Sequence, residues 1–447
     1  MEEFNTKLMK YSPVIGLEVH VELKTNSKMF CSCSADYFGQ KPNTHTCPVC
    51  LGLPGALPFP NKKAIEWCIM IGMSLNCEIP LFSKFDRKNY FYPDLSKGYQ
   101  ISQYDKPFCI NGHITLSSGK KIGVTRVHME EDTGKLIHEN INGKGVSLID
   151  FNRSGVPLVE IVTEPDFETA EDVKEYLQKL QQIVRYLQVS NADMEKGNMR
   201  LEPNISLKKP GEKGLPKYKV EVKNINSFSF VGKAIEFELK RQAEILDKGK
   251  LPVQETRGFV EKSSSTVSQR VKEEASDYRY FPEPDIPPIR WTKEKINELK
   301  KQIPELPNEK AKRLSEEFKI RLTDAIIATD DISLANSFEE TLKLGQKHNL
   351  DSQKLANFII NRKINLLEEL PAKIVENFIK ANVNTDLSDN ELNKIIEQVI
   401  KDNTKAVEDY KKGKETVIMF LVGQVMRQFK QKIDANKVKA SLLAKLK

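Results

Sequence analysis

Two short runs in which acids alternate with aliphatic residues constrain the fold most strongly. The first run, VIGLEVHVEL at 14–23, places Glu18, His20 and Glu22 at every second position. The second run, VPLVEIVTE at 156–164, places Glu160 between Val159 and Ile161. Because successive side chains of a strand point to opposite faces, both runs predict strands with one polar and one apolar face. Such strands require a sheet that covers a core on one side.

The polar faces of these strands have the composition of a cation site. Carboxylates and an imidazole at every second position suit a hard divalent cation, especially when another strand adds oxygen ligands. Three further acids, Glu130, Glu131 and Asp132, come together just before a Gly-Lys turn. The same spacing also describes an ordinary strand with one solvated face, so both interpretations stay open.

Length and composition indicate a globular protein of two or three domains. The chain has 447 residues, of which 39% are hydrophobic and 29% are charged. No apolar run approaches the roughly 20 residues of a membrane helix, and the first residues do not resemble a signal peptide. We therefore expect a cytoplasmic protein without a membrane partner.

Seven cysteines, an odd number, favour a reducing compartment and metal ligation over a disulfide framework. Four of them, Cys31, Cys33, Cys47 and Cys50, form a C-x-C-x13-C-x2-C pattern. Two close pairs of thiolates are the ligands of a structural, tetrahedral zinc ion with no open position. The other three cysteines are expected to be ordinary buried thiols.

The order of strand-like and helical segments predicts an α+β fold followed by a helical tail. Helices are expected at 61–75, 168–189 and 228–248, and hairpin turns at Asn111-Gly112, Ser118-Gly119 and Asn142-Gly143. A proline-dense segment at 278–288 marks the main boundary. We expect domains at 1–293 and 294–447, the second formed by successive helices.

Two segments have the composition of nucleotide or nucleic-acid contacts. Residues 85–103 combine aromatic and basic side chains around a Pro-Asp turn, which suits either phosphate and base binding or a rim packed on the core. Residues 411–447 hold ten basic and two acidic residues, against a net charge of +7 for the whole chain. A polyanion partner and a solvated lysine-rich surface both explain this tail.

Several common catalytic motifs are absent from the sequence. It contains neither G-x-x-x-x-G-K-[ST] nor G-x-G-x-x-G, so any nucleotide chemistry is of neither the Walker nor the Rossmann type. It also lacks the G-x-S-x-G elbow of serine hydrolases.

Seven blocks, in order along the chain, resemble one family. They are IGLEVHVEL at 15–23, KFDRKNYFYPDL at 84–95, HMEEDTGK at 128–135, NRSGVPLVEI at 152–161, EVKNINSF at 221–228, DYRYFPEPD at 277–285 and FLVGQVM at 420–426. These blocks are similar to the signatures of GatB, the B subunit of the aspartyl/glutamyl-tRNA(Asn/Gln) amidotransferases.

The resemblance implies a fold and a reaction. The fold would be a cradle domain similar to the glutamine synthetase and guanidino kinase class, with an inserted zinc knuckle, and a helical tail that ends in a YqeY-like domain. The enzyme would be a ligase that uses ATP and Mg²⁺ to phosphorylate the side-chain carboxylate of Glu-tRNA(Gln) or Asp-tRNA(Asn). Ammonia from an amidase (glutaminase) partner, GatA, would then displace phosphate, in a heterotrimer completed by the small partner GatC.

The resemblance also implies roles for individual residues. His20, Glu131 and Glu160 would be catalytic and would bind Mg²⁺ with Glu18 nearby, although imidazole is an unusual ligand for so hard a cation. Contacts to ATP or substrate would come from five residues: Arg87, Lys88, Tyr90, Arg153 and Lys223. Glu202 stands where the family usually has aspartate, and for that reason it is left out of the expected ligands.

A second function is compatible with the same sequence features. A zinc-containing tRNA-binding protein with an inactive acidic site would share the cysteines and the basic tail. ATP hydrolysis stimulated by Glu-tRNA(Gln) distinguishes the two functions.

Overall fold

The computed structural model describes residues 10–209, 211–271, 278–382, 389–428 and 435–446. Contacts within the chain divide it into two compact units, Met1–Pro307 and Asn308–Lys447. The first unit contains all the strands and the second is helical, as the α+β prediction with a helical tail requires.

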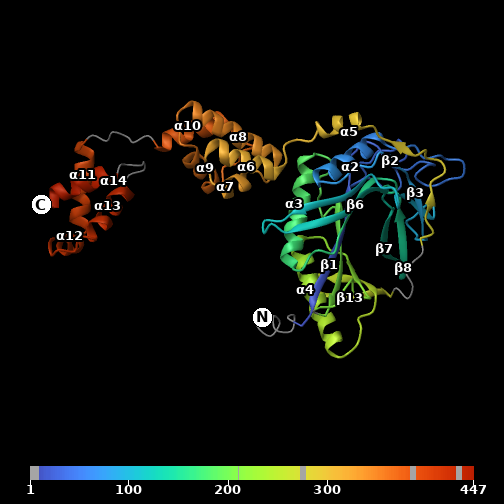
Figure 1. The fold of residues 1–447 in the computed structure, drawn as a ribbon. Coiled ribbons are helices and arrows are strands. Elements are labelled where there is room, and N and C mark those ends of the chain that lie inside the picture. The colour runs from blue at the N-terminus through green and yellow to red at the C-terminus, as the bar shows by residue number, and fades with distance from the viewer. Residues whose placement is uncertain (1–9, 210, 272–277, 383–388, 429–434, 447) are drawn as a thin grey trace. The chain divides into compact units, whose positions relative to one another are not determined.

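An eight-stranded sheet forms the centre of the first unit (Figure 1). Its order is β13-β12-β11-β10-β1-β9-β6-β5, with one parallel pair, β11 and β12. The strands are β1 (Ser12–Glu22), β5 (Cys109–Thr115), β6 (Lys121–Glu131), β9 (Pro157–Thr163), β10 (Met199–Lys208), β11 (Val220–Lys223), β12 (Glu255–Val260) and β13 (Ser265–Val271). Strand β1, at the N-terminus, lies between β10 and β9, so the sheet forms only when distant segments meet.

The alternation in the sequence separates the two faces of this sheet as predicted. Leu17, Val19, Val21 and Leu23 are buried in the main hydrophobic core. Helices α2 (Lys62–Ser74), α3 (Ala170–Tyr186) and α4 (Phe228–Asp247) contribute to the same core and match the three expected helical segments. The other face is therefore lined by Glu18, His20 and Glu22 of β1, His128 and Glu130 of β6, and Glu160 of β9.

The other described strands form three smaller sheets. Strands β3 (Asp86–Asn89), β4 (Tyr99–Ser102) and β14 (Phe281–Pro282) form a three-stranded sheet, and β2 (Phe82–Ser83) pairs with β15 (Ile289–Arg290). Strands β7 (Lys135–Ile141) and β8 (Lys144–Asp150) form a separate hairpin, which faces the large sheet across an opening between the ribbons (Figure 1).

Two of the three predicted hairpin turns are confirmed. Ser118-Gly119 joins β5 to β6, and Asn142-Gly143 joins β7 to β8. The turn at Asn111-Gly112 is wrong, because both residues lie inside β5. Asn111 has a φ of 55° and is skipped in the pairing with β6, whose register is the same before and after it. Gly112 approaches the 75–77 loop so closely that a Cβ atom would lie 2.7 Å from the backbone oxygen of Leu75.

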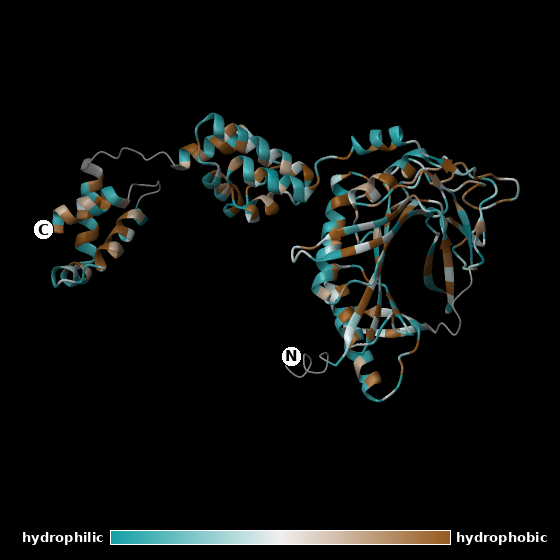
Figure 2. Ribbon diagram, in the orientation of Figure 1, coloured by the Kyte–Doolittle hydropathy of each residue, from teal (hydrophilic) through white to brown (hydrophobic). Residues whose placement is uncertain are grey.

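The chain continues through α5 (Lys293–Lys300), which packs on α2, into the helical unit. Its first five helices, α6 (Pro307–Phe318), α7 (Leu322–Ala328), α8 (Ile332–Lys347), α9 (Ser352–Asn361) and α10 (Pro371–Asn382), share one core. A second core joins α11 (Asp389–Asp402), α12 (Thr404–Lys411), α13 (Val417–Gln428) and α14 (Ala435–Leu446). The helices carry both apolar and polar residues (Figure 2), and no helix of the described residues is long and apolar enough to cross a membrane.

Candidate active site

Three strands that lie side by side bring a carboxylate and two imidazoles together on the polar face of the sheet. In the register of β1, β9 and β6, His20 and His128 both lie opposite Glu160. The Oε2 atom of Glu160 is 3.7 Å from Nε2 of His20 and 3.3 Å from Nε2 of His128. Strand pairing therefore assembles a cluster from three distant parts of the sequence.

Glu130 completes this first cluster, because it lies two residues after His128 on the same face of β6. Its Oε1 atom is 3.6 Å from Nε2 of His128. One ligand atom from each of His20, Glu130 and Glu160 lies within 4.8 Å of the other two. The hydroxyl of Ser102 donates a hydrogen bond of 2.7 Å to Glu130 and holds its carboxylate in place.

The structure does not bring Glu131, an expected ligand, to this cluster. Glu131 is one residue further along β6, so strand parity turns its side chain away from that of Glu130. Its carboxylate accepts a hydrogen bond of 3.0 Å from the backbone N–H of Ile101 and pairs with Lys97. These contacts tie the end of β6 to β4, which is a structural arrangement.

Positive neighbours keep the carboxylates of the first cluster ionised although they are buried. Burial acts to raise the pKa of Glu130, but Lys88 and His128 lower it to about 2. Burial opposes ionisation of Glu160 too, yet the two imidazoles hold its pKa well below the usual range. Burial acts to lower the pKa of His20, whereas the neighbouring carboxylate of Glu160 raises it to about 9. The cluster therefore presents two anionic carboxylates at neutral pH.

A second cluster of acids lies beside the first on the same face. Glu18, Glu202 and Glu221 each have a carboxylate oxygen within 4.8 Å of the other two. Glu202 lies directly opposite Glu18 in the pairing of β10 with β1. Burial, followed by the charges of Glu160 and Glu202, raises the pKa of Glu18. A cation would relieve this repulsion. The alternation of Glu202 with apolar residues along β10 is the sequence signal that could have predicted Glu202 as a ligand.

Buried polar atoms without partners mark the same face as a ligand site. Within the described residues, His20 Nδ1, His128 Nδ1, Arg126 Nε and Asn204 Oδ1 have no solvent contact and no hydrogen bond. Asn204 also donates a hydrogen bond of 3.0 Å to Glu18, so its free oxygen lies at the second cluster. Carboxylate and amide oxygens fit Mg²⁺, and a cation at the first cluster would replace the proton of an imidazole.

Three of the residues expected to contact ATP or substrate lie close to the two clusters. Lys88 is 3.6 Å from Oε1 of Glu130, and Lys223 is 2.9 Å from Oε2 of Glu202. Tyr90 donates a hydrogen bond of 3.2 Å to a side chain of β4. Charges of Glu130 and Glu160 raise the pKa of Lys88 well above its usual value, although burial opposes this shift.

The other two residues are engaged in contacts within the protein. Arg87 donates to both carboxylate oxygens of Glu283, at 2.6 and 2.9 Å. Arg153 donates to two backbone carbonyls of the turn after β6, at 3.0 and 2.7 Å, and lies 3.7 Å from Asp132. Their hydrogen bonds position β14 and the turn that follows β6.

The four cysteines of the predicted zinc motif come together in a loop beside the sheet. The Sγ atoms of Cys31, Cys33, Cys47 and Cys50 all lie within 4.8 Å of one another. Cys47 and Cys50 are 3.9 Å apart, close to the separation of about 3.8 Å that follows from tetrahedral Zn–S bonds of about 2.3 Å. The buried ammonium group of Lys28 lies 3.6 Å from Sγ of Cys50 and balances thiolate charge.

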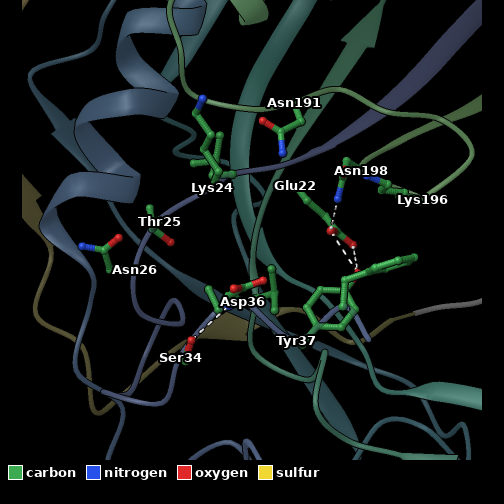
Figure 3. A pocket seen from close by; sticks show the side chains of 14 residues that line it. Glu22, Lys24, Thr25, Asn26, Ser34, Asp36, Tyr37, Asn191, Lys196 and Asn198 are labelled. Atoms are coloured by element: carbon green, nitrogen blue, oxygen red, sulfur yellow. Dashed lines mark hydrogen bonds between the residues drawn. The ribbon is translucent and has the colours of Figure 1, made fainter. Parts of the chain in front are cut away.

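A pocket of about 580 Å³ lies where this loop meets the end of β1 (Figure 3). Glu22 lies at its inner side and accepts hydrogen bonds from Tyr37, at 3.1 Å, and from Asn198, at 3.0 Å. Arg200, at 3.2 Å, joins Glu22 to Asp132. Burial and the charge of Asp132 raise the pKa of Glu22 to about 7. This network connects the cysteine loop to the strand that holds His20.

Comparison with known proteins identifies the family. A model described as the GatB/GatE catalytic domain matches residues 13–297, and a model described as the GatB domain matches residues 294–446. The chain belongs to the GatB family. Among curated relatives, a GatB chain of Thermoanaerobacter pseudethanolicus is 45% identical over 95% of this chain and 97% of its own. That of Persephonella marina is 44% identical, over 97% and 100%.

Both GatB relatives are named as the B subunit of aspartyl/glutamyl-tRNA(Asn/Gln) amidotransferase, as is that of Thermosipho melanesiensis, which is 45% identical over 96% of this chain. The catalytic-domain match spans all of the eight-stranded sheet except Ser12, the first residue of β1, and includes both acidic clusters of this GatB chain. The second match covers the helical unit, which the model's name relates to YqeY.

Proposed function

We propose that this GatB chain catalyses the ATP-dependent amidation of the carboxylate of Glu-tRNA(Gln) or Asp-tRNA(Asn). The products are Gln-tRNA(Gln) and Asn-tRNA(Asn). The names of the relatives support the reaction class. The observation that carries the proposal for this chain is the pair of acidic clusters on one buried face, with unpartnered polar atoms beside them.

The reaction proceeds in two displacements. An oxygen of the substrate carboxylate attacks the γ-phosphorus of ATP, the bond to the β–γ bridging oxygen breaks, and ADP leaves. Ammonia then attacks the carbonyl carbon of the acyl phosphate, phosphate departs with the bonding electrons, and the nitrogen loses a proton. Phosphorylation is needed because a carboxylate oxygen is a poor leaving group, and such transfer depends on positioning and charge stabilisation.

The two clusters would hold the divalent cations. His20, Glu130 and Glu160 form one ligand set, and Glu18, Glu202 and Glu221 form the other. Mg²⁺ held by these residues would neutralise phosphoryl oxygens and orient the reacting groups. In this assignment Glu130 takes the place that the family resemblance implied for Glu131, because only Glu130 shares the face of His20.

Basic and aromatic side chains around the clusters bind the substrates. Lys88 lies between Glu130 and the ring of Tyr278, 5.2 Å from its centroid, at the side of the first cluster. Lys223 lies beside the second. Both ammonium groups can attract the negative charge of ATP and the substrate carboxylate. Arg87, Tyr90 and Arg153 support the walls that hold these groups.

The cysteine loop would hold a structural zinc ion. Four thiolates fill a tetrahedral coordination sphere, so the ion has no position for substrate and acts on stability. The hydrogen bonds from Tyr37 and Arg200 to Glu22 extend from this loop to β1. The loop therefore fixes the end of the strand that carries the ligands of the first cluster.

The remaining assignments follow from the family. The first domain, proposed at 1–293, would be a cradle of the glutamine synthetase and guanidino kinase class, and 294–447 would be the helical tail that contacts tRNA. Ammonia would come from the amidase partner GatA in a cytoplasmic complex that includes the small partner GatC. The designation of the relatives as the B subunit of an amidotransferase supports such an assembly.

ATP hydrolysis by the reconstituted complex tests the proposal. We expect Glu-tRNA(Gln) or Asp-tRNA(Asn) to stimulate hydrolysis, whereas uncharged tRNA does not, because the carboxylate is the phosphoryl acceptor. A complex that binds tRNA and zinc but shows no stimulated hydrolysis would be the non-catalytic tRNA-binding protein instead.

A further inference from the structure

An arginine on the floor of the site belongs to neither of the two acidic clusters. Arg126 lies on β6, two residues before His128 and opposite Val162 of β9. Glu18 lies opposite Val162 on the other side, in the pairing of β9 with β1. Since cross-strand partners share a face, Arg126 belongs to the same polar face as both acidic clusters. Across the three paired strands, only the half-buried Val162 lies between Arg126 and Glu18.

The side chain of Arg126 has no ion-pair partner among the described residues, unlike the side chains of other arginines of the sheet. Arg200 pairs with Asp132 at 2.8 Å, and Arg257 pairs with Glu255 at 2.7 Å. In the part of the chain that the structure describes, the side chain of Arg126 makes no ion pair or hydrogen bond, and its Nε atom is shut off from solvent. A buried donor without an acceptor is costly, and an acceptor oxygen of a bound ligand would satisfy this N–H group.

The surroundings indicate the chemistry of that ligand. The carboxylates of the first cluster pair with His20, His128 and Lys88, and Glu18 belongs to the second cluster. The guanidinium of Arg126 therefore remains available as a donor to a ligand. A guanidinium offers parallel N–H donors that match two oxygens of a phosphoryl or carboxylate group. Tyr280 lies close enough for the charge of Arg126 to act on its pKa, which burial raises to about 12.

We propose that Arg126 binds an oxyanion of the reacting substrates, either the phosphoryl group that is transferred or the carboxylate that receives it. This inference rests on the proposed function and adds a substrate-binding residue to it. Arg126 supplies a fixed positive charge at the side of the metal clusters, where charge accumulates during the transfer.

Substitution of Arg126 in the reconstituted complex tests the inference. The variants are Arg126→Gln, which removes the charge, and Arg126→Lys, which keeps the charge but loses the paired donors. Lys121→Gln is the matched control, because Lys121 is exposed and this substitution removes one positive charge from the same strand. Binding constants for ATP and ADP, each with Mg²⁺, and for aminoacylated and uncharged tRNA are measured for every variant.

The two possible ligands give different results. If Arg126 binds the transferred phosphoryl group, Arg126→Gln should weaken ATP binding about 10–100-fold and leave ADP within about twofold. If it binds the carboxylate, the preference for Glu-tRNA(Gln) over uncharged tRNA should fall by a similar factor. Arg126→Lys should show the same selective loss to a smaller extent. It keeps the test possible if the Arg126→Gln complex fails to assemble.

The inference is overturned if both preferences are unchanged in the Arg126 variants, even when turnover falls, because a structural arginine would act on turnover without such selectivity. In that case hydrolysis by the wild-type complex still supports the proposed function. A wild-type complex without stimulated hydrolysis would overturn both.

Discussion

At the scale of single residues, two consecutive glutamates of β6 have different environments because their side chains leave the strand on opposite faces. Glu130 joins His20 and Glu160, whereas Glu131 pairs with Lys97 and binds the backbone of β4. Both carboxylates are buried, so burial does not distinguish a ligand from a structural acid. The partners on the adjacent strands do.

We expect Glu130→Gln and Glu160→Gln each to lower the rate of ATP-dependent activation by on the order of 10²–10³-fold, because each loses a charge that faces the cation. Glu131→Gln should lower the melting temperature through the lost pair with Lys97 and reduce the rate less. Activation is measured as phosphorylation of Glu-tRNA(Gln), with the glutaminase activity of the partner as control. Near wild-type rates in the Glu130 and Glu160 variants would reject the metal-site assignment.

The carboxylate of Glu339 should make the stability of the helical unit depend on pH. Burial acts to raise the pKa of Glu339, but hydrogen bonds from Arg313, Lys343 and Lys310 lower it to about 2 from its ordinary value of 4.5. Because the folded form has the lower pKa, the stabilisation is complete above pH 4.5 and is lost as the pH falls toward 2.

Glu339→Gln should therefore destabilise the helical unit by about 1–2 kcal/mol at pH 7, with solvent screening part of the interaction. The difference from wild type should shrink steadily below pH 4.5. Calorimetric unfolding at several pH values measures this, with the exposed neighbour Glu340 changed to Gln as control. A difference that does not depend on pH would show that packing, and not charge, holds Glu339.

At the scale of elements, the cysteine loop and β1 are joined by side-chain hydrogen bonds. Tyr37 of the loop donates to Glu22, the last residue of β1, and Lys28, which follows β1, reaches Cys50. The loop can thus act on the site through the position of a strand end. Its effect on catalysis would be indirect.

Cys47→Ser with Cys50→Ser should abolish binding of about one zinc ion per chain and lower local stability, because two of four ligands are lost. The dependence of activity on Mg²⁺ should stay unchanged. Metal analysis and chelator competition measure the loss, and Cys77→Ser, outside the cluster, is the control. Wild-type protein without zinc, whose four thiols all react freely, would contradict this prediction.

At the scale of the whole molecule, the basic tail keeps its charge on the surface. In α13 and α14 the apolar residues Leu421, Val425, Val438 and Leu442 are buried in the last core. The lysines of α14 lie on the remaining surface, where Lys437 and Lys439 are exposed. Residues 429–434 and 447 of this tail lie outside the described residues.

Changing Lys437 and Lys439 to Gln should weaken binding of tRNA by the complex and raise KM for the aminoacyl-tRNA. The plot of log affinity against log salt should become flatter by up to about one unit per lost phosphate contact. Lys250→Gln, an exposed change in the first unit, is the control, and ATP turnover at saturating tRNA should fall less. Equal salt slopes in all variants would show that the tail is only a solvated surface.

Local pattern was sufficient for much of the fold. Alternation with period two predicted both faces of β1 and β9, and apolar periodicity predicted α2, α3 and α4. The cysteine spacing predicted a set of thiols that the structure brings together. These properties depend on neighbours within one segment, so the sequence contains them directly. The turn predicted at Asn111-Gly112 was wrong. Gly112 is needed because β5 packs closely against the 75–77 loop, and this contact is not local in sequence.

The sequence by itself determined which residues share a face, which thiols can form a site and where helices replace strands. Only the tertiary structure decided which strands are neighbours. That pairing places Glu130 rather than Glu131 beside His20, sets Glu202 opposite Glu18, and leaves Arg126 without a partner among the described residues. The physical reason is that side-chain parity is a property of a single strand, whereas lateral register depends on how distant segments pack over a common core.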